Sequence, residues 1–212
     1  MSPSPTSDRE SRVRGARAAA PPLGPGDCPL EALREVHFLQ RQICLDMESL
    51  ADTTTARPAL ALDVLTNLCR DLLLHHADED EGLFPLLRQR ALEEDEMDRL
   101  LTRLSADHVA IAAAIPPLLP ALACMVDHAL PAPEDRAALR ALAQTQRLHM
   151  IIENAILLPL AQARLTDADR RQLIASMVAR RASPPALRGP CARLSDGTPA
   201  ACTIAQTVGA NR

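Results

Sequence analysis

The sequence predicts an all-α protein, an antiparallel up-and-down four-helix bundle, and three observations support this prediction. Apolar residues recur at spacings of three and four along four successive segments. The connections between these segments are short enough to join antiparallel neighbours. The core must consist mainly of Leu, Ala, Ile and Val, because the chain contains two Phe and no Trp or Tyr. That composition favours helices.

The 212 residues fit one domain with two tails, and 47% hydrophobic residues suffice for a sizeable core. Residues 1–27 and 182–212 are rich in Pro, Gly, Ser, Thr and Ala without apolar periodicity, so we expect flexible tails there. The bundle is expected in residues 28–181. The N-terminal segment has no continuous apolar stretch to act as a signal peptide or to span a bilayer, so we expect a cytoplasmic protein.

Charge and cysteine usage exclude several classes of partner. The 23 basic and 27 acidic residues give a net charge of -4, which offers no electrostatic case for a nucleic-acid or anionic-membrane partner. The six cysteines are scattered without CxxC pairs, which predicts neither a disulfide scaffold nor a zinc site. Cys44, Cys69 and Cys124 are expected to act as small buried apolar residues.

The first two helices are expected on either side of a break at residues 53–58, TTTARP. Pro29 suits the first turn of a helix that runs to about Ala51. The second helix begins at about Pro58, and Pro85 is expected to bend it. The inward positions are Leu33, His37, Gln40, Cys44 and Met47 in the first helix, and Leu65, Leu68, Leu72, His75, Glu79, Leu83 and Leu86 in the second.

The third helix is expected to begin near Glu93, and prolines 116, 117 and 120 should distort its second half. A fourth helix follows the turn-like segment HALPAPED. A last helix over residues 167–181 begins with a motif that resembles a capping box, and it should pack outside the bundle. The inward positions are Met97, Leu101, Leu104, His108, Ile111, Ile115 and Leu118 in the third helix, and Leu139, Leu142, Gln146, His149, Glu153, Ile156 and Leu160 in the fourth.

Each of the four apolar stripes contains one histidine, and two of them also contain a glutamate. An ionised carboxylate inside a bundle is costly unless it is paired or bound to a metal, and these stripes offer no Lys or Arg. We therefore predict a metal site and no separate catalytic residue. Its candidate ligands are His37, His75, Glu79, His108, His149 and Glu153.

The spacing of these residues indicates two ions. His75 and Glu79 are four residues apart, as are His149 and Glu153, so each pair lies one helical turn apart on one face. Four imidazoles and two carboxylates exceed the needs of one zinc site and suit two ions bridged by carboxylates. Imidazole with carboxylate and no thiolate favours iron or manganese over zinc or copper.

Each candidate also has an ordinary structural explanation. A single histidine on an apolar face, such as His37, is more often a hydrogen-bonded core residue than a ligand. His75 and Glu79 alone could form a solvated pair inside the acidic run HHADEDE. His149 and Glu153 are surrounded by apolar residues, so they make the most specific pair.

Two further histidines have different expected roles. His76 could replace His75 as the ligand, with Asp80 four residues on, or could support the site without binding metal directly. The apolar stripe favours His75. His128 lies by a Pro-rich turn outside the periodic stripes and is expected at the surface.

Two segments resemble the signature segments of the hemerythrin or HHE cation-binding family: HHADEDEGLFPLL at 75–87 and HMIIENAILLPLA at 149–161. The resemblance covers residues from about 29 to 180. It implies a hemerythrin-like bundle with two non-haem iron ions, in which Glu79 and Glu153 are bridging ligands. One position departs from the oxygen carriers of the family, which have a second histidine one turn after the third-helix ligand. Here that position is Ala112.

The resemblance implies a metal-binding protein that takes up O2, NO or peroxide for sensing, storage or stress response. The alternative is a di-iron enzyme that decomposes hydrogen peroxide or reduces nitric oxide, because a missing ligand leaves a coordination position open. A scaffold with vestigial ligands is a third hypothesis, which the presence of all six candidate ligands disfavours. A ferritin-like site needs four inward carboxylates and ExxH pairs, which are absent here.

Overall fold

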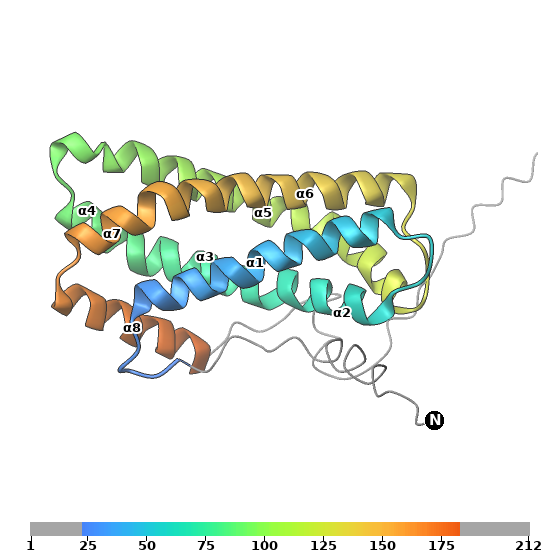
Figure 1. Ribbon diagram of the computed structural model, residues 1–212, viewed down its shortest axis with the longest axis horizontal. Coiled ribbons are helices and arrows are strands. Elements are labelled where there is room, and N and C mark those ends of the chain that lie inside the picture. The colour runs from blue at the N-terminus through green and yellow to red at the C-terminus, as the bar shows by residue number, and fades with distance from the viewer. Residues whose placement is uncertain (1–22, 183–212) are drawn as a thin grey trace, which may run out of the picture.

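The computed structural model describes residues 23–182, and every regular element in this part of the chain is helical. Most of both expected tails therefore lies outside the described residues. The helical elements, labelled as in Figure 1, are α1 (Pro29–Asp52), α2 (Pro58–Thr66), η1 (Asn67–Asp71), α3 (Leu72–Asp78), η2 (Glu79–Leu83), α4 (Phe84–Arg90), η3 (Glu93–Asp95), α5 (Met97–Val126), α6 (Pro133–Ile152), η4 (Glu153–Leu157), α7 (Leu158–Arg164) and α8 (Asp167–Ala182).

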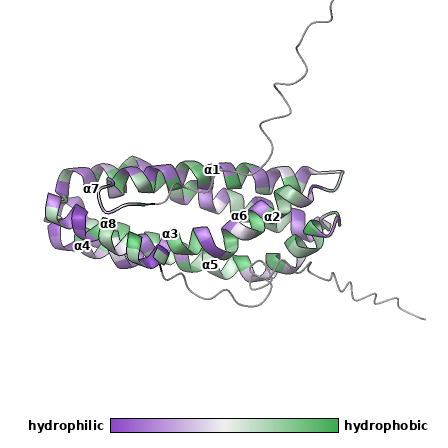
Figure 2. Cartoon of the chain, turned by 90° about the horizontal axis from the view of Figure 1, so that it is seen from below, coloured by the Kyte–Doolittle hydropathy of each residue, from purple (hydrophilic) through white to green (hydrophobic). Residues whose placement is uncertain are grey.

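The helices form a bundle whose long segments lie side by side along the long axis of the molecule (Figure 1). α1 packs against α6, α2 packs against α5, and α5 also contacts α6. Hydrophilic and hydrophobic residues alternate along the helices (Figure 2), as expected where each helix buries one face. The prediction of an all-α bundle is confirmed.

The core consists of two apolar clusters with the predicted site residues between them. On α1, for example, Leu33 belongs to one cluster and Cys44 to the other, and His37 lies between them in the sequence. On α5, Leu104 and Ile111 flank His108 in the same way. The apolar positions of each stripe thus hold the polar residues at mid-length of the bundle.

Within residues 23–182, three π-helical turns interrupt the α-helical pattern, and two of them begin at the predicted ligands Glu79 and Glu153. Each of these two turns is followed by a proline, at Pro85 or Pro159. Proline lacks an N–H and clashes with the carbonyl four residues earlier, and the wider π turn relieves this conflict. The bend expected at Pro85 therefore takes the form of a π turn just before it.

The π turn in the fourth helix also corrects two inward positions. Ile156 and Leu160 were expected inside, but Ile156 is 47% exposed and Leu160 is half-buried. Leu157 and Ala161 are buried in their place. The π turn contains an additional residue, which moves the inward face on by one position.

α5 runs without interruption from Met97 to Val126, so the expected distortion does not break the helix. All three prolines of this helix lie on its exposed side. Water can therefore solvate the carbonyl groups that lose their helical partners. By length and composition alone, Glu93–Val126 is the one helix in the described residues that could cross a membrane, and core helices of bundles share this composition.

The cysteines differ from expectation. Cys44 and Cys69 are buried in the core, as predicted, whereas Cys124 is half-buried. Cys44 has a free thiol, but Cys69 and Cys124 are each disulfide-bonded. The expectation that all three act only as small apolar residues is therefore wrong for Cys69 and Cys124.

α8 (Asp167–Ala182) confirms the predicted last helix. Thr166 and Asp169 form the predicted cap: the Asp169 N–H donates to Thr166 Oγ1 at 3.2 Å, and the Thr166 N–H donates to Asp169 Oδ2 at 2.9 Å. α8 is attached to the second helix through Asp78, whose buried carboxylate pairs with Arg180 at 2.8 Å and Arg181 at 2.7 Å.

Candidate metal centre

All six predicted ligands are buried at the middle of the bundle, and none is more than 3% exposed. α1 supplies His37, and α3 with the start of η2 supplies His75 and Glu79. α5 supplies His108, and α6 with the start of η4 supplies His149 and Glu153. The structure therefore brings together side chains from four helical segments that are far apart in the sequence. His128 is exposed, as predicted.

The six residues form two overlapping groups that share both glutamates. One group contains His37, His75, Glu79 and Glu153, and the other contains Glu79, His108, His149 and Glu153. Within each group the potential ligand atoms all lie within 4.8 Å of one another. His37 Nε2 lies 3.5 Å from Glu79 Oε1 and 3.4 Å from Glu153 Oε2. On the other side, His149 Nε2 lies 2.9 Å from Glu153 Oε1.

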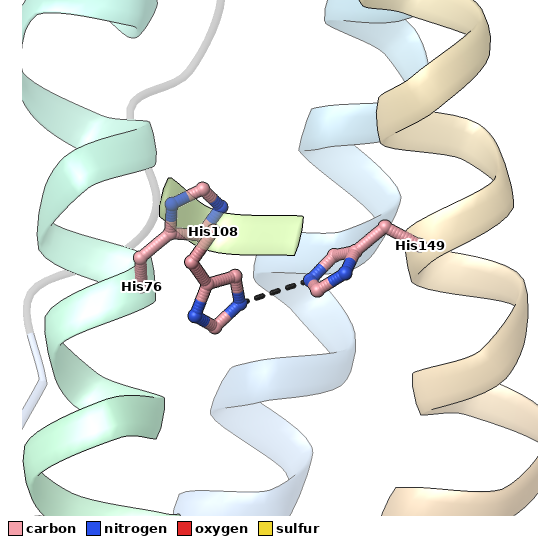
Figure 3. Close-up of side chains that lie close together, drawn as sticks. All are labelled: His76, His108 and His149. Carbon is pink, nitrogen blue, oxygen red and sulfur yellow. Dashed lines mark hydrogen bonds between the residues drawn. The ribbon is translucent and has the colours of Figure 1, made fainter. Parts of the chain in front are cut away.

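His76 forms a third possible ligand group with His108 and His149, which also belong to the second group. The His76 ring stacks on the His108 ring, with ring centroids 4.0 Å apart and an interplanar angle of 13°. Figure 3 shows these two side chains next to each other. His76, His108 and His149 offer ligand atoms within 4.8 Å of one another. His108 Nε2 and His149 Nε2 are 2.9 Å apart. The sequence left open whether His75 or His76 is the ligand. Both side chains reach the site, and each belongs to a possible ligand group.

The donor set fits a metal cation. Both carboxylate oxygens of Glu79 and Glu153 are buried without a hydrogen-bond partner, and so are His37 Nε2, His76 Nε2 and both ring nitrogens of His75. Buried polar atoms are rarely left unpaired in proteins. Imidazole nitrogen and carboxylate oxygen are both common ligands of iron and manganese.

The profile of the hemerythrin HHE cation-binding domain matches residues 28–161, which is most of the chain. The chain belongs to the hemerythrin HHE family. Comparisons with curated proteins and with solved structures find no match. Membership implies that the site binds a cation, and the two His/Glu groups are the residues that can do so. α8 lies beyond the matched residues.

Asp80 and Asn154, which lie outside the ligand groups, each orient one histidine, and Ser105 holds Asp80 in place. His108 Nδ1 donates to Asp80 Oδ2 at 2.8 Å, and Ser105 Oγ donates to the other Asp80 oxygen at 2.7 Å. His37 Nδ1 donates to Asn154 Oδ1 at 3.2 Å. In both histidines the contact engages Nδ1, on the outer side of the ring, and leaves Nε2 directed inward for a metal.

These outer contacts could not be predicted from the sequence. Asp80 follows Glu79 directly, and Asn154 follows Glu153 directly, but each contacts a histidine on a different helix. No local spacing links the two partners, so only the packing of the helices identifies them. The one local signal is that each residue stands next to a predicted ligand.

The ionisation states suit a metal site. Burial alone raises the pKa of the Glu79 carboxyl, but the imidazoles of His108 and His37, which lie 3.4 and 3.5 Å away, outweigh it and hold the pKa below its ordinary value. Burial lowers the pKa of His75, and the nearby His37 lowers it further. Burial also lowers the pKa of His76, to about 2, with a further contribution from His108. Glu79 therefore stays ionised, while His75 and His76 keep a free lone pair.

His108 balances the buried negative charge in the metal-free protein. Burial lowers its pKa, but the hydrogen bond with Asp80 and the nearby carboxylates of Glu153 and Glu79 outweigh this and raise the pKa to about 11. A proton on His108 thus offsets part of the charge of the two glutamates. A metal cation would supply that charge instead and release the proton.

Proposed function

We propose that this chain is a non-haem di-iron protein that binds a small ligand, O2, NO or peroxide, for sensing, storage or stress response. The observation that carries the proposal is that Glu79 and Glu153 belong to both ligand groups. Two carboxylates shared between two sets of histidines suit two cations side by side. With His76 included, the chain offers five imidazoles and two carboxylates in one buried cluster.

We further propose that the four site-bearing segments form an antiparallel up-and-down bundle, with α8 outside it. The proposal is supported by ion pairs between α1 and α6, in which Glu48 pairs with Arg147 and Asp52 pairs with Arg140. As the residue number rises along α1, the number of its partner on α6 falls. These two helices therefore run in opposite directions. Short connections join the other neighbours.

The residues of this chain have separate tasks in the proposed site. His37, His75 and the two glutamates would hold one iron, and His76, His108, His149 and the same glutamates would hold the other. An iron pair supplies reversible binding of small ligands and electron transfer. Asp80 and Asn154 keep two of the imidazoles oriented, and the apolar clusters on both sides keep water away from the site.

Metal content and absorption spectra test the proposal directly. Elemental analysis of freshly purified protein should find two irons per chain, and the spectrum should show oxo-bridge bands that respond to peroxide and to reduction under air. The rate of peroxide loss would then separate a peroxide-consuming enzyme from a binding protein. Absence of iron even after anaerobic reconstitution would refute the proposal.

Substitution of a shared ligand localises the site. Glu153→Ala should lower iron content, because Glu153 belongs to both ligand groups. His128→Ala is the matched control, since His128 is exposed and lies outside both groups. Full iron occupancy in Glu153→Ala, or a clear loss of iron in His128→Ala, would show that the site is misplaced.

A further inference from the structure

Two glutamines lie on the same inward stripes as the histidines, and the proposed site does not use them. Gln40 follows His37 by three residues on α1, and Gln146 precedes His149 by three residues on α6. Both side chains are only 1% exposed. Gln40 Oε1 and both amide atoms of Gln146 have no hydrogen-bond partner.

Unpaired amides in this place require an explanation. An apolar side chain would fill the same space without the cost of burying an unpaired polar group. The other inward residues of these stripes near the site are apolar, for example Cys44 and Leu142. Two glutamines with unpaired atoms beside the ligand cluster therefore indicate a polar partner that enters from outside the chain.

The register of α1 against α6 places Gln40 level with the centre of the site. His37 contacts Asn154, and Glu48 pairs with Arg147. The stretch of α1 between those two contacts therefore lies opposite residues 147–154 of α6, which include His149 and Glu153. Gln40 is within that stretch, so its amide lies at the level of the ligand groups.

Gln146 lies level with Ala112 of α5. The 2.9 Å contact between His108 and His149 puts these two residues at the same level. α5 and α6 contact each other and are joined by residues 127–132, so they run in opposite directions. One turn after His108 on α5 is Ala112, which is therefore level with Gln146. The alanine side chain offers no hydrogen-bonding group to the amide of Gln146, whose two polar atoms are unpaired.

We propose that Gln40 and Gln146 hydrogen-bond the small ligand bound at the metal centre. This inference rests on the proposed function and narrows its ligand class. An amide donates and accepts, so the pair selects ligands that form hydrogen bonds, such as peroxide, hydroxide or azide. The two amides then make the space around the bound ligand polar. Selection among small ligands depends on hydrogen bonds to these amides as well as on the metal.

Methionine substitutions test the proposal, because methionine keeps the length of glutamine and removes the amide. Gln40→Met and Gln146→Met are compared with wild type and with Gln172→Met, an exposed glutamine on α8. Iron content is measured first. Azide affinity of the iron-loaded proteins is then measured by absorption titration, and thermal unfolding of the metal-free proteins is measured separately.

Both buried variants should bind azide about tenfold more weakly than wild type, as expected for loss of one hydrogen bond, and Gln172→Met should not. Their metal-free forms should unfold at the wild-type temperature or above it, because an unpaired buried amide has been removed. Unchanged azide affinity would overturn the proposal. A lower unfolding temperature of the metal-free variants would also overturn it, since it would show that the amides serve the fold. Absence of iron in the wild type would instead refute the proposed function.

Discussion

At the scale of single residues, His75 and His76 show how neighbours in the sequence enter different ligand groups. Successive residues of an α-helix are about 100° apart around the axis. A pair of adjacent residues can therefore straddle the inward face, and His75 then points toward His37 while His76 points toward His108. The deeply buried position of both rings follows from this arrangement.

His76→Ala tests whether His76 binds metal. The variant should release one of its two ions at a lower chelator concentration than wild type, because the group around His108 and His149 loses one imidazole. Chelator competition followed by iron release measures this, with His128→Ala as the control. A release curve identical to that of wild type would show that His76 only packs against His108.

At the scale of elements, the π turn η2, which begins at Glu79, lies in close contact with α8. Gly82 lies in η2, and a Cβ atom there would lie 2.8 Å from Leu173 Cδ1 and 2.9 Å from Arg180 Nη2 of α8. The lack of a side chain at Gly82 therefore allows the close approach of α8. Asp78, one residue before η2, pairs with two arginines of the same helix.

Loss of these arginines should destabilise the bundle. In the double variant Arg180→Gln and Arg181→Gln, the fully buried carboxylate of Asp78 loses both partners. Breaking a buried ion pair from one side is strongly destabilising, and because the arginines are partly exposed we expect roughly 2–3 kcal/mol of lost unfolding free energy. Urea unfolding measures the change. Arg171→Gln, an exposed position on α8, is the control. Equal unfolding of double variant and control would show that α8 is held by apolar contacts alone.

The stability that Asp95 contributes at the start of the third helix should decrease in acid. A hydrogen bond with Arg164, and then one with the Leu92 N–H, lower the pKa of Asp95 from 3.8 to about 2. A carboxyl with a lower pKa in the folded state contributes stability above its unfolded pKa and loses it as pH falls through the folded pKa. The unfolding temperature of wild type should therefore exceed that of Asp95→Asn at pH 6, and the difference should shrink between about pH 4 and pH 2.

Thermal unfolding across this pH range measures the effect. Asp98→Asn is a suitable control, because the Asp98 side chain is 90% exposed. A difference between wild type and Asp95→Asn that stays constant from pH 6 to pH 2 would contradict the role of the Arg164 contact.

At the scale of the whole molecule, the metal centre divides the core. The layer between the two apolar clusters contains unpaired imidazole and carboxylate atoms. Such atoms lower the stability of the metal-free fold. A bound cation pairs them and therefore links metal binding to the stability of the entire bundle.

Metal removal should accordingly lower stability. A ligand that binds only the folded state adds about 4 kcal/mol at a free concentration a thousandfold above its Kd. The iron-loaded protein should thus unfold at a distinctly higher temperature than the chelated protein, while far-ultraviolet circular dichroism stays helical in both. Calorimetry of the two forms measures the difference. Coincident unfolding curves would mean that the cluster binds no metal in the folded state.

The sequence by itself determined the helical class, the four stripes and the six candidate ligands, because all of these depend on periodicities within one helix. His149 and Glu153, for example, are four residues apart and need no tertiary information. Only the tertiary structure decided that His76 joins the site, that Asp80 and Asn154 orient histidines on other helices, and that Leu157 replaces Ile156 inside. These features depend on rotation and register between helices and on π turns, which spacing along a single helix does not encode.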